Sequence, residues 1–171
     1  TFEEYERTSL DIANEIIRRE LERKLQSIAD GHAARLLIDH NNDWHGWRDG
    51  TAFEYAQHEL GIVTYHSLVG GLNIRRFTYR ECHRYGATYV PLELDAGLME
   101  RMTPGLARGV AHGFADMPMR RFEQLLLSVG RKPPSRSTLE RCALDLGSYA
   151  MGANEEIEPL VRANETVPKE A

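Results

Sequence analysis

Residues 130–141, GRKPPSRSTLER, bring together side chains that can contact the phosphates and base edges of a nucleic acid. Ser137 and Glu140 have the spacing of a capping box, which predicts a helix that begins at Ser137. Apolar residues at helical steps then form its core face: Leu139, Ala143, Leu146 and Ala150. The side chains outside this face are Arg136, Thr138 and Arg141, with Arg131 and Lys132 in the turn before them.

Two helices are expected before this one. Pro104 and Pro118 can each occupy the first turn of a helix, which predicts helices over 104–115 and 118–129, followed by the last helix over 137–151. This spacing is that of a tri-helical helix-turn-helix unit, in which the first residues of the last helix meet base edges. We therefore expect DNA contacts from Arg136, Ser137, Thr138, Arg141, Arg131 and Lys132. Any three short helices with a polar turn give the same pattern, so a plain scaffold remains an alternative.

A β-hairpin precedes the helices. Between Ile62 and Cys82, β-branched and aromatic runs flank Gly70-Gly71, which predicts two strands joined by a two-residue glycine turn. A third short strand is expected over 87–90. The returning strand carries Arg75, Arg76 and Arg80. These arginines could contact phosphates or protect an exposed sheet edge by their charge, and the sequence leaves both interpretations open.

The chain begins with a long amphipathic helix. Apolar residues from Phe2 to about Asp30 recur mostly at three- and four-residue steps, and the helical pattern continues over 33–38. The pattern lacks the three to four clean heptads of a coiled coil, so we expect a solvated outer face and a monomer or weak homodimer. A polar loop follows over 39–50, and the helical pattern returns after Pro91, first over 96–102.

Together these elements predict an α+β fold that is predominantly α-helical. Its expected parts are an N-terminal helical region and loop (1–60), a small hairpin or three-strand module (61–91), a helix-turn-helix-like domain (92–151) and an acidic linker (152–171).

Residue types that bind metals or act as nucleophiles occur without the spacing that their chemistry needs. The loop over 39–50 holds His40, His45 and three aspartates at irregular intervals, and neither His66 nor the Cys82-His83 pair has a partner cysteine nearby. An acidic group at Glu93, Asp95 and Glu100 is not matched by a base or nucleophile. We therefore expect no metal, no cofactor and no catalytic residue in these 171 residues, and reduced cysteines at 82 and 142.

The net charge of −5 argues against a chain coated in basic residues, so any DNA-binding surface must be local. No apolar run approaches the roughly 18 residues that span a bilayer, and the acidic start is unlike an export signal. A cytoplasmic protein without membrane contact is expected.

Most of the chain resembles the amino-terminal region of the Kra-four group of bacterial insertion-sequence transposases. Three runs in one order carry the resemblance: TYHSLVGGLNIRRFTYR at 64–80, VPLELDAGLMERMTPGLARGVAHGFADMPMRRFEQLL at 90–126 and KPPSRSTLERCALDLG at 132–147. The resemblance implies DNA transposition and recombination, with recognition of the element's terminal repeats in double-stranded DNA. It also implies an RNase H-like catalytic domain with an acidic triad and a divalent metal, expected after Ala171.

The sequence differs from the pattern of this family at one point. Many of these transposases carry paired cysteines resembling a zinc ribbon in the strand region, whereas this chain has RECHRYGATYV at 80–90, with a single cysteine. Two other interpretations of the chain remain. It is either a protein-interaction or oligomerisation module built on the first helix, or a domesticated DNA-binding regulator that has lost its catalytic half. Arginines of the hairpin and last helix on one shared face would favour DNA, and an exposed apolar stripe on the first helix would favour a partner protein.

Overall fold

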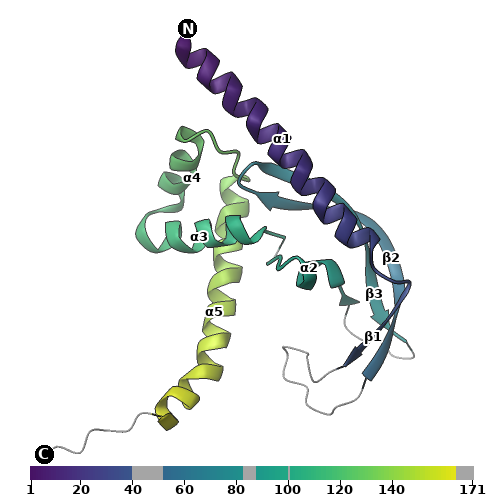
Figure 1. The fold of residues 1–171 in the computed structure, drawn as a ribbon. Helices are drawn as coiled ribbons and strands as arrows, with labels where there is room; N and C mark the ends of the chain where they lie inside the picture. The colour runs from purple at the N-terminus through teal and green to yellow at the C-terminus, as the bar shows by residue number, and fades with distance from the viewer. Residues whose placement is uncertain (40–51, 83–87, 100, 165–171) are drawn as a thin grey trace, which may run out of the picture.

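The computed structural model describes residues 1–39, 52–82, 88–99 and 101–164, and Figure 1 shows the arrangement of its elements. Helix α1 (Phe2–Asp30) begins with a capping box, in which the Thr1 hydroxyl accepts a hydrogen bond from the Glu4 N–H at 3.3 Å. Only Asn14, Leu25 and Ala29 of α1 are buried. The amino-terminal half of α1 therefore projects beyond the rest of the molecule (Figure 1).

A four-stranded antiparallel sheet lies beside α1. Its strands are β1 (Arg35–Asp39), β2 (Ala52–Ser67), β3 (Gly70–Glu81) and β4 (Thr88–Tyr89), in the order β1-β2-β3-β4. A bulge between Gln57 and Glu59 shifts the β2–β3 register. Tyr65, Leu72 and Ile74 of the sheet form one core with Leu25 and Ala29 of α1 and with Leu92 and Leu98.

Four helices follow the sheet: α2 (Pro91–Asp95), α3 (Pro104–Asp116), α4 (Met119–Ser128) and α5 (Arg136–Asn164). Helices α3, α4 and the first turns of α5 enclose a second core, which includes Leu106, Val110, Phe122, Leu139 and Cys142. Leu68 at the tip of the β2–β3 hairpin packs against this core. The hairpin tip is thus the point where the sheet meets the three-helix unit of α3, α4 and α5.

The expectation of a predominantly helical fold with a small hairpin or three-strand module is wrong, because the chain has a mixed α+β fold with a four-stranded sheet. Residues 35–39 form β1 instead of continuing the first helix, and β2 starts at Ala52, ten residues before the predicted Ile62. Leu36-Leu37-Ile38 is a short apolar run, which fits a strand as well as a helix. In the first half of β2 the polar run Gln57-His58-Glu59 interrupts the two-residue apolar period.

Three further boundaries differ from the prediction. The hairpin turns at Leu68-Val69, with Gly70 as the first residue of β3 at φ +116°. The Ser67 hydroxyl stabilises this turn, because it accepts from the Val69 N–H at 3.2 Å and donates to the Gly70 carbonyl at 2.7 Å. Residues 96–99 and 101–102 are not helical, and α5 continues through part of the predicted linker to Asn164. The predicted helices over 104–115 and 118–129 are confirmed within one residue.

Candidate nucleic-acid interface

Ser135, two residues before the predicted cap, caps the start of α5. Its hydroxyl accepts from the Thr138 N–H at 3.4 Å, and its carbonyl accepts from the Leu139 N–H at 2.9 Å. The predicted capping box of Ser137 and Glu140 does not form. Glu140 instead lies 3.7 Å from Arg136 in an exposed ion pair. The loop from Val129 to Ser135 is longer than the three or four residues of a typical helix-turn-helix turn.

The predicted inner and outer faces of α5 agree with the structure over its first turns. Leu139, Cys142 and Ala143 are buried against α3 and α4. The exposed residues on the outside are Arg136, Ser137, Glu140, Arg141 and Leu144, while Thr138 is half-buried with its hydroxyl 2.9 Å from that of Ser135.

Arg141 approaches the end of the hairpin at His66. The pKa of His66 is lowered from its ordinary value, first by burial of the imidazole, then by the positive charge of Arg141 and by that of Arg101. Arg101 is exposed and has φ +65°, in the turn where Met99 and Met102 exchange two backbone hydrogen bonds. Its carbonyl accepts from the His66 N–H at 2.7 Å. Two arginines far apart in the sequence therefore place their charge next to one neutral histidine.

Neither arginine forms an ion pair with another described residue. The sequence interpretation missed Arg101 and set aside His66, because no local pattern links residues 66, 101 and 141. The parallel bridge between His66 and Met102 brings the first two together, and the packing of α5 on α3 brings the third.

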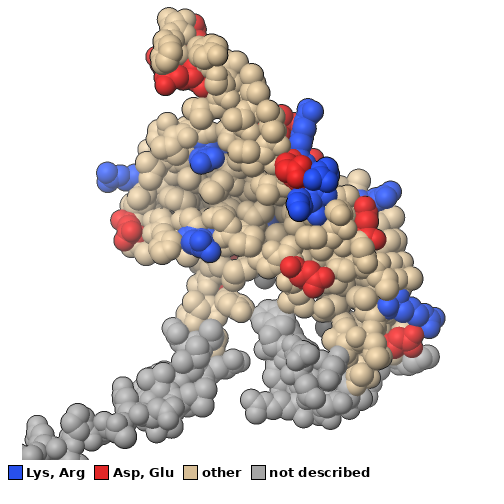
Figure 2. Space-filling model, in the orientation of Figure 1, with Lys and Arg blue, Asp and Glu red and all other residues tan. Residues whose placement is uncertain are grey.

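Residues 101–145, which form α3, α4 and the first turns of α5, are basic within an acidic chain. Residues 101–145 hold eight arginines and lysines against four aspartates and glutamates, a net of +4 where the whole chain has −5. In the view of Figure 2, the cations on this unit stand apart from one another, and anions lie beside cations over α1 and the sheet. The basic character is local, as the sequence predicted, but this face shows no continuous basic band.

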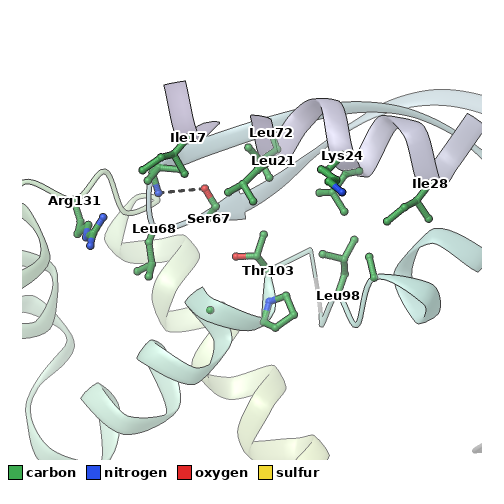
Figure 3. Close-up of a pocket in the computed structure, with 15 residues that line it drawn as sticks. Ile17, Leu21, Lys24, Ile28, Ser67, Leu68, Leu72, Leu98, Thr103 and Arg131 are labelled. Atoms are coloured by element: carbon green, nitrogen blue, oxygen red, sulfur yellow. Dashed lines mark hydrogen bonds between the residues drawn. The ribbon is translucent and has the colours of Figure 1, made fainter. Parts of the chain in front are cut away.

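Arg131 and Lys132, which we expected at phosphates, lie in a loop that is fastened to other elements. The Lys132 N–H donates to the Leu68 carbonyl at 3.0 Å, and its ammonium lies 3.0 Å from Asp11 in an exposed ion pair. The buried amide of Asn14 donates to the Gly130 carbonyl at 2.6 Å. Arg131 lies at one end of an apolar groove beside α1 (Figure 3).

The three hairpin arginines differ from one another. The Arg76 side chain is only 9% exposed and lies 3.3 Å from the Glu93 carboxylate, which also accepts from the Tyr65 hydroxyl at 2.9 Å. Arg80 is half-buried with an unpartnered Nε, and Arg75 is exposed. Gly71, not Arg75, lies opposite His66 in the sheet, which puts Arg75 about 13 Å further along β3. The backbone of the hairpin arginines is thus not brought to the start of α5, so the shared arginine face expected for DNA is not formed by the hairpin and the last helix.

Among the described residues, no group of three histidine, cysteine, aspartate or glutamate side chains could hold a metal ion. The carboxylate of Asp95, from the acidic group, accepts a hydrogen bond from Nε2 of His32 at 2.9 Å. His40, His45, His83 and Glu100 lie outside the described residues. Within the described part of the chain, none of the helices has the length and apolar character needed to cross a membrane.

Comparison with known proteins gives no match of this chain to a family model, to a curated protein or to a solved structure.

Proposed function

We propose that this chain is the DNA-binding segment of an insertion-sequence transposase and that its three-helix unit contacts double-stranded DNA. One observation carries the proposal. Arg101 and Arg141 are exposed, lack an acidic partner among the described residues and act together on His66, within a stretch (101–145) whose net charge is +4. Two such guanidinium groups can each donate paired hydrogen bonds to one or two neighbouring phosphates.

The residues of the unit would have different tasks. Arg136 and Ser137 lie on the exposed first turn of α5, the part of a recognition helix that reaches base edges. Arg101 and Arg141 would position the duplex through its phosphates, with Arg131, Lys132 and Arg75 as further exposed cations. Arg76 is withdrawn from this set, because its guanidinium is buried against Glu93.

The family resemblance supports the choice of transposition over other DNA-binding functions. Under this proposal the segment recognises the terminal repeats of its element, in the cytoplasm of a bacterium. The metal-dependent chemistry would belong to an RNase H-like domain outside these 171 residues. The chain itself would bind DNA and catalyse nothing.

The test is a series of binding titrations at several salt concentrations, with the terminal repeat of the element and a scrambled duplex of equal length. The wild type should bind both duplexes at low salt and prefer the repeat. Arg101→Ala and Arg141→Ala should weaken binding to both duplexes and reduce the salt dependence by about one counterion each. Arg136→Ala should reduce the preference for the repeat by about 1–3 kcal/mol.

Arg7→Ala is the matched control, because Arg7 is an exposed arginine on the projecting end of α1. Its affinity and salt dependence should equal those of the wild type. Failure of the folded wild type to bind either duplex at low salt would contradict the proposal. Equal losses from Arg7→Ala and Arg141→Ala would also contradict it, since they would show attraction by overall charge alone.

A further inference from the structure

An apolar groove of about 480 Å³ lies where α1 meets the hairpin tip and the start of α3. Ile17, Leu21 and Ile28 of α1 line one side, and Leu68, Leu98 and Pro104 lie across from them. Figure 3 shows these side chains converging from separate elements on one open space. Ile17 and Leu21 remain 45% and 37% exposed there, although they lie on the same side of α1 as the core.

Two cations mark the groove. Lys24 and Arg131 line it, and Figure 3 places them toward opposite ends. Both are exposed, and neither forms an ion pair with another described residue. A groove with an apolar floor and two exposed cations suits an amphipathic segment that carries negative charge.

The projecting half of α1 is a segment of that kind. Its large apolar side chains Phe2, Tyr5, Ile12 and Ile16 are 76%, 71%, 57% and 63% exposed. With Ser9 they recur at alternating steps of three and four residues, which forms the narrow stripe by which a helix packs on a partner. Glu3, Glu4 and Glu6 make the same half acidic.

This half of α1 cannot reach the groove of its own copy. The groove is lined by residues 17–28 of the same continuous helix, so the stripe and the groove lie one after the other along a single rod. In a second copy that runs antiparallel, residues 2–16 come to lie beside residues 17–28 of the first. The two segments have similar lengths, about 22 Å and 18 Å.

We propose that the groove binds the amino-terminal half of α1 from a second copy of this chain, in a reciprocal two-fold dimer. Each copy inserts its own helix into the partner's groove and binds the partner's helix in its own groove. Every contact therefore forms twice, and no free groove remains to bind a third copy. The acidic start of each α1 lies near Lys24 of the other copy, whereas Arg131, at the Ile17 end of the groove, lies near residues 14–16 of that helix. Phe2, Tyr5, Ile12 and Ile16 lose their contact with water against the apolar groove.

Sedimentation equilibrium over a range of protein concentrations, without DNA, measures the dimer directly. The wild type should show a monomer–dimer equilibrium. Phe2→Ser with Tyr5→Ser should weaken the dimer at least about tenfold, since two exposed aromatic side chains lose their burial. Ile62→Ser is the control, because Ile62 is 74% exposed on β2, outside both surfaces.

A charge exchange tests which surface receives the helix. Lys24→Glu reverses the charge of the groove where the helix start binds, and Glu3→Lys with Glu6→Lys reverses the charge of the helix start, so each variant alone should be monomeric. An equal mixture of the two should restore a dimer, because each acidic surface then meets a basic one. Circular dichroism of each variant establishes that it is folded.

A wild type that stays monomeric into the millimolar range would overturn the proposal. So would a dimer that resists the Phe2 and Tyr5 substitutions. A dimer that these substitutions weaken but the charge exchange leaves unchanged would also overturn it, by showing that the helix pairs elsewhere. Since the assay contains no DNA, these outcomes are independent of the proposed DNA binding.

Discussion

Gln26 of α1 holds the backbone of Arg75 in β3 as a neighbouring strand would. Its amide oxygen accepts from the Arg75 N–H at 2.9 Å, and its amide nitrogen donates to the Arg75 carbonyl at 2.8 Å. One turn earlier, Glu22 accepts from the Asn73 N–H at 2.7 Å, and Arg18 reaches the Gly71 carbonyl. Steps of four residues along a helix, about 6 Å, match steps of two along a strand, about 6.8 Å. Side chains of α1 thus cover the edge of β3 that β4 leaves open.

Replacing Gln26 should loosen this edge. We expect Gln26→Ala to lower the free energy of unfolding by about 1–2 kcal/mol, because two backbone groups lose their partner. Urea denaturation measures the change. Gln124→Ala, on the exposed side of α4, should stay within about 0.5 kcal/mol of the wild type. An equal effect of the two substitutions would show that the Gln26 bonds contribute nothing specific.

Gly113 of α3 lies against the ring of Phe122 of α4, where a Cβ would overlap three ring atoms. We expect Gly113→Ala to cost about 1–3 kcal/mol of unfolding free energy, because the two helices must separate. Gly109, one turn earlier in α3, offers the matched control, since its Cβ would lie 3.9 Å from the ring. Gly109→Ala should be neutral or stabilise by up to about 1 kcal/mol, from helix propensity alone. Thermal unfolding that ranks the two variants in the opposite order would contradict this account.

The sequence predicts local helices well and the sheet poorly, for a physical reason. Pro104, Pro118 and Gly130 mark helix ends by their own backbone restrictions, and α3 and α4 lie where these residues predict. The limits of β2 depend instead on pairing with β1 and β3. In its first half, Ala52–Leu60, the polar run Gln57-His58-Glu59 interrupts the apolar alternation, so the local pattern does not mark the whole segment as a strand.

The residues of the candidate site likewise fall into those that the sequence could predict and those that it could not. The outer position of Arg136 and Arg141 follows from helical periodicity and could be predicted. The sequence could not predict that Arg76 is buried away from the candidate interface, or that Arg101 belongs to it. Arg76 is buried by Glu93, 17 residues further along the chain, and Arg101 comes to His66 through a bridge between a strand and a turn.

The Arg76–Glu93 pair should contribute to stability and not to DNA binding. Arg76→Met leaves the partly buried Glu93 carboxylate with only the Tyr65 hydroxyl, so we expect a loss of about 2–4 kcal/mol in unfolding free energy. Arg75→Met, one residue away and exposed, should cost less than about 0.5 kcal/mol. Urea denaturation compares the two variants. At a temperature where Arg76→Met is folded, its DNA affinity should equal that of the wild type, and a loss as large as that of Arg141→Ala would return Arg76 to the interface.

His66 should make DNA binding depend on pH. In the free protein, burial, Arg141 and Arg101 lower the pKa of His66, so the imidazole is neutral at pH 7. A phosphate bound at the two arginines offsets their charge and raises that pKa, so the complex takes up a proton that the free protein does not hold. Affinity should therefore be constant on the alkaline side, where His66 is neutral in both states, and rise as the pH falls through the raised pKa of His66 in the complex.

His66→Gln should remove this rise in affinity. His58→Gln, at an exposed histidine of β2, should retain it. Titrations between pH 5.5 and 8 at fixed ionic strength measure the effect, and an affinity that falls with decreasing pH would place the phosphate away from Arg101 and Arg141.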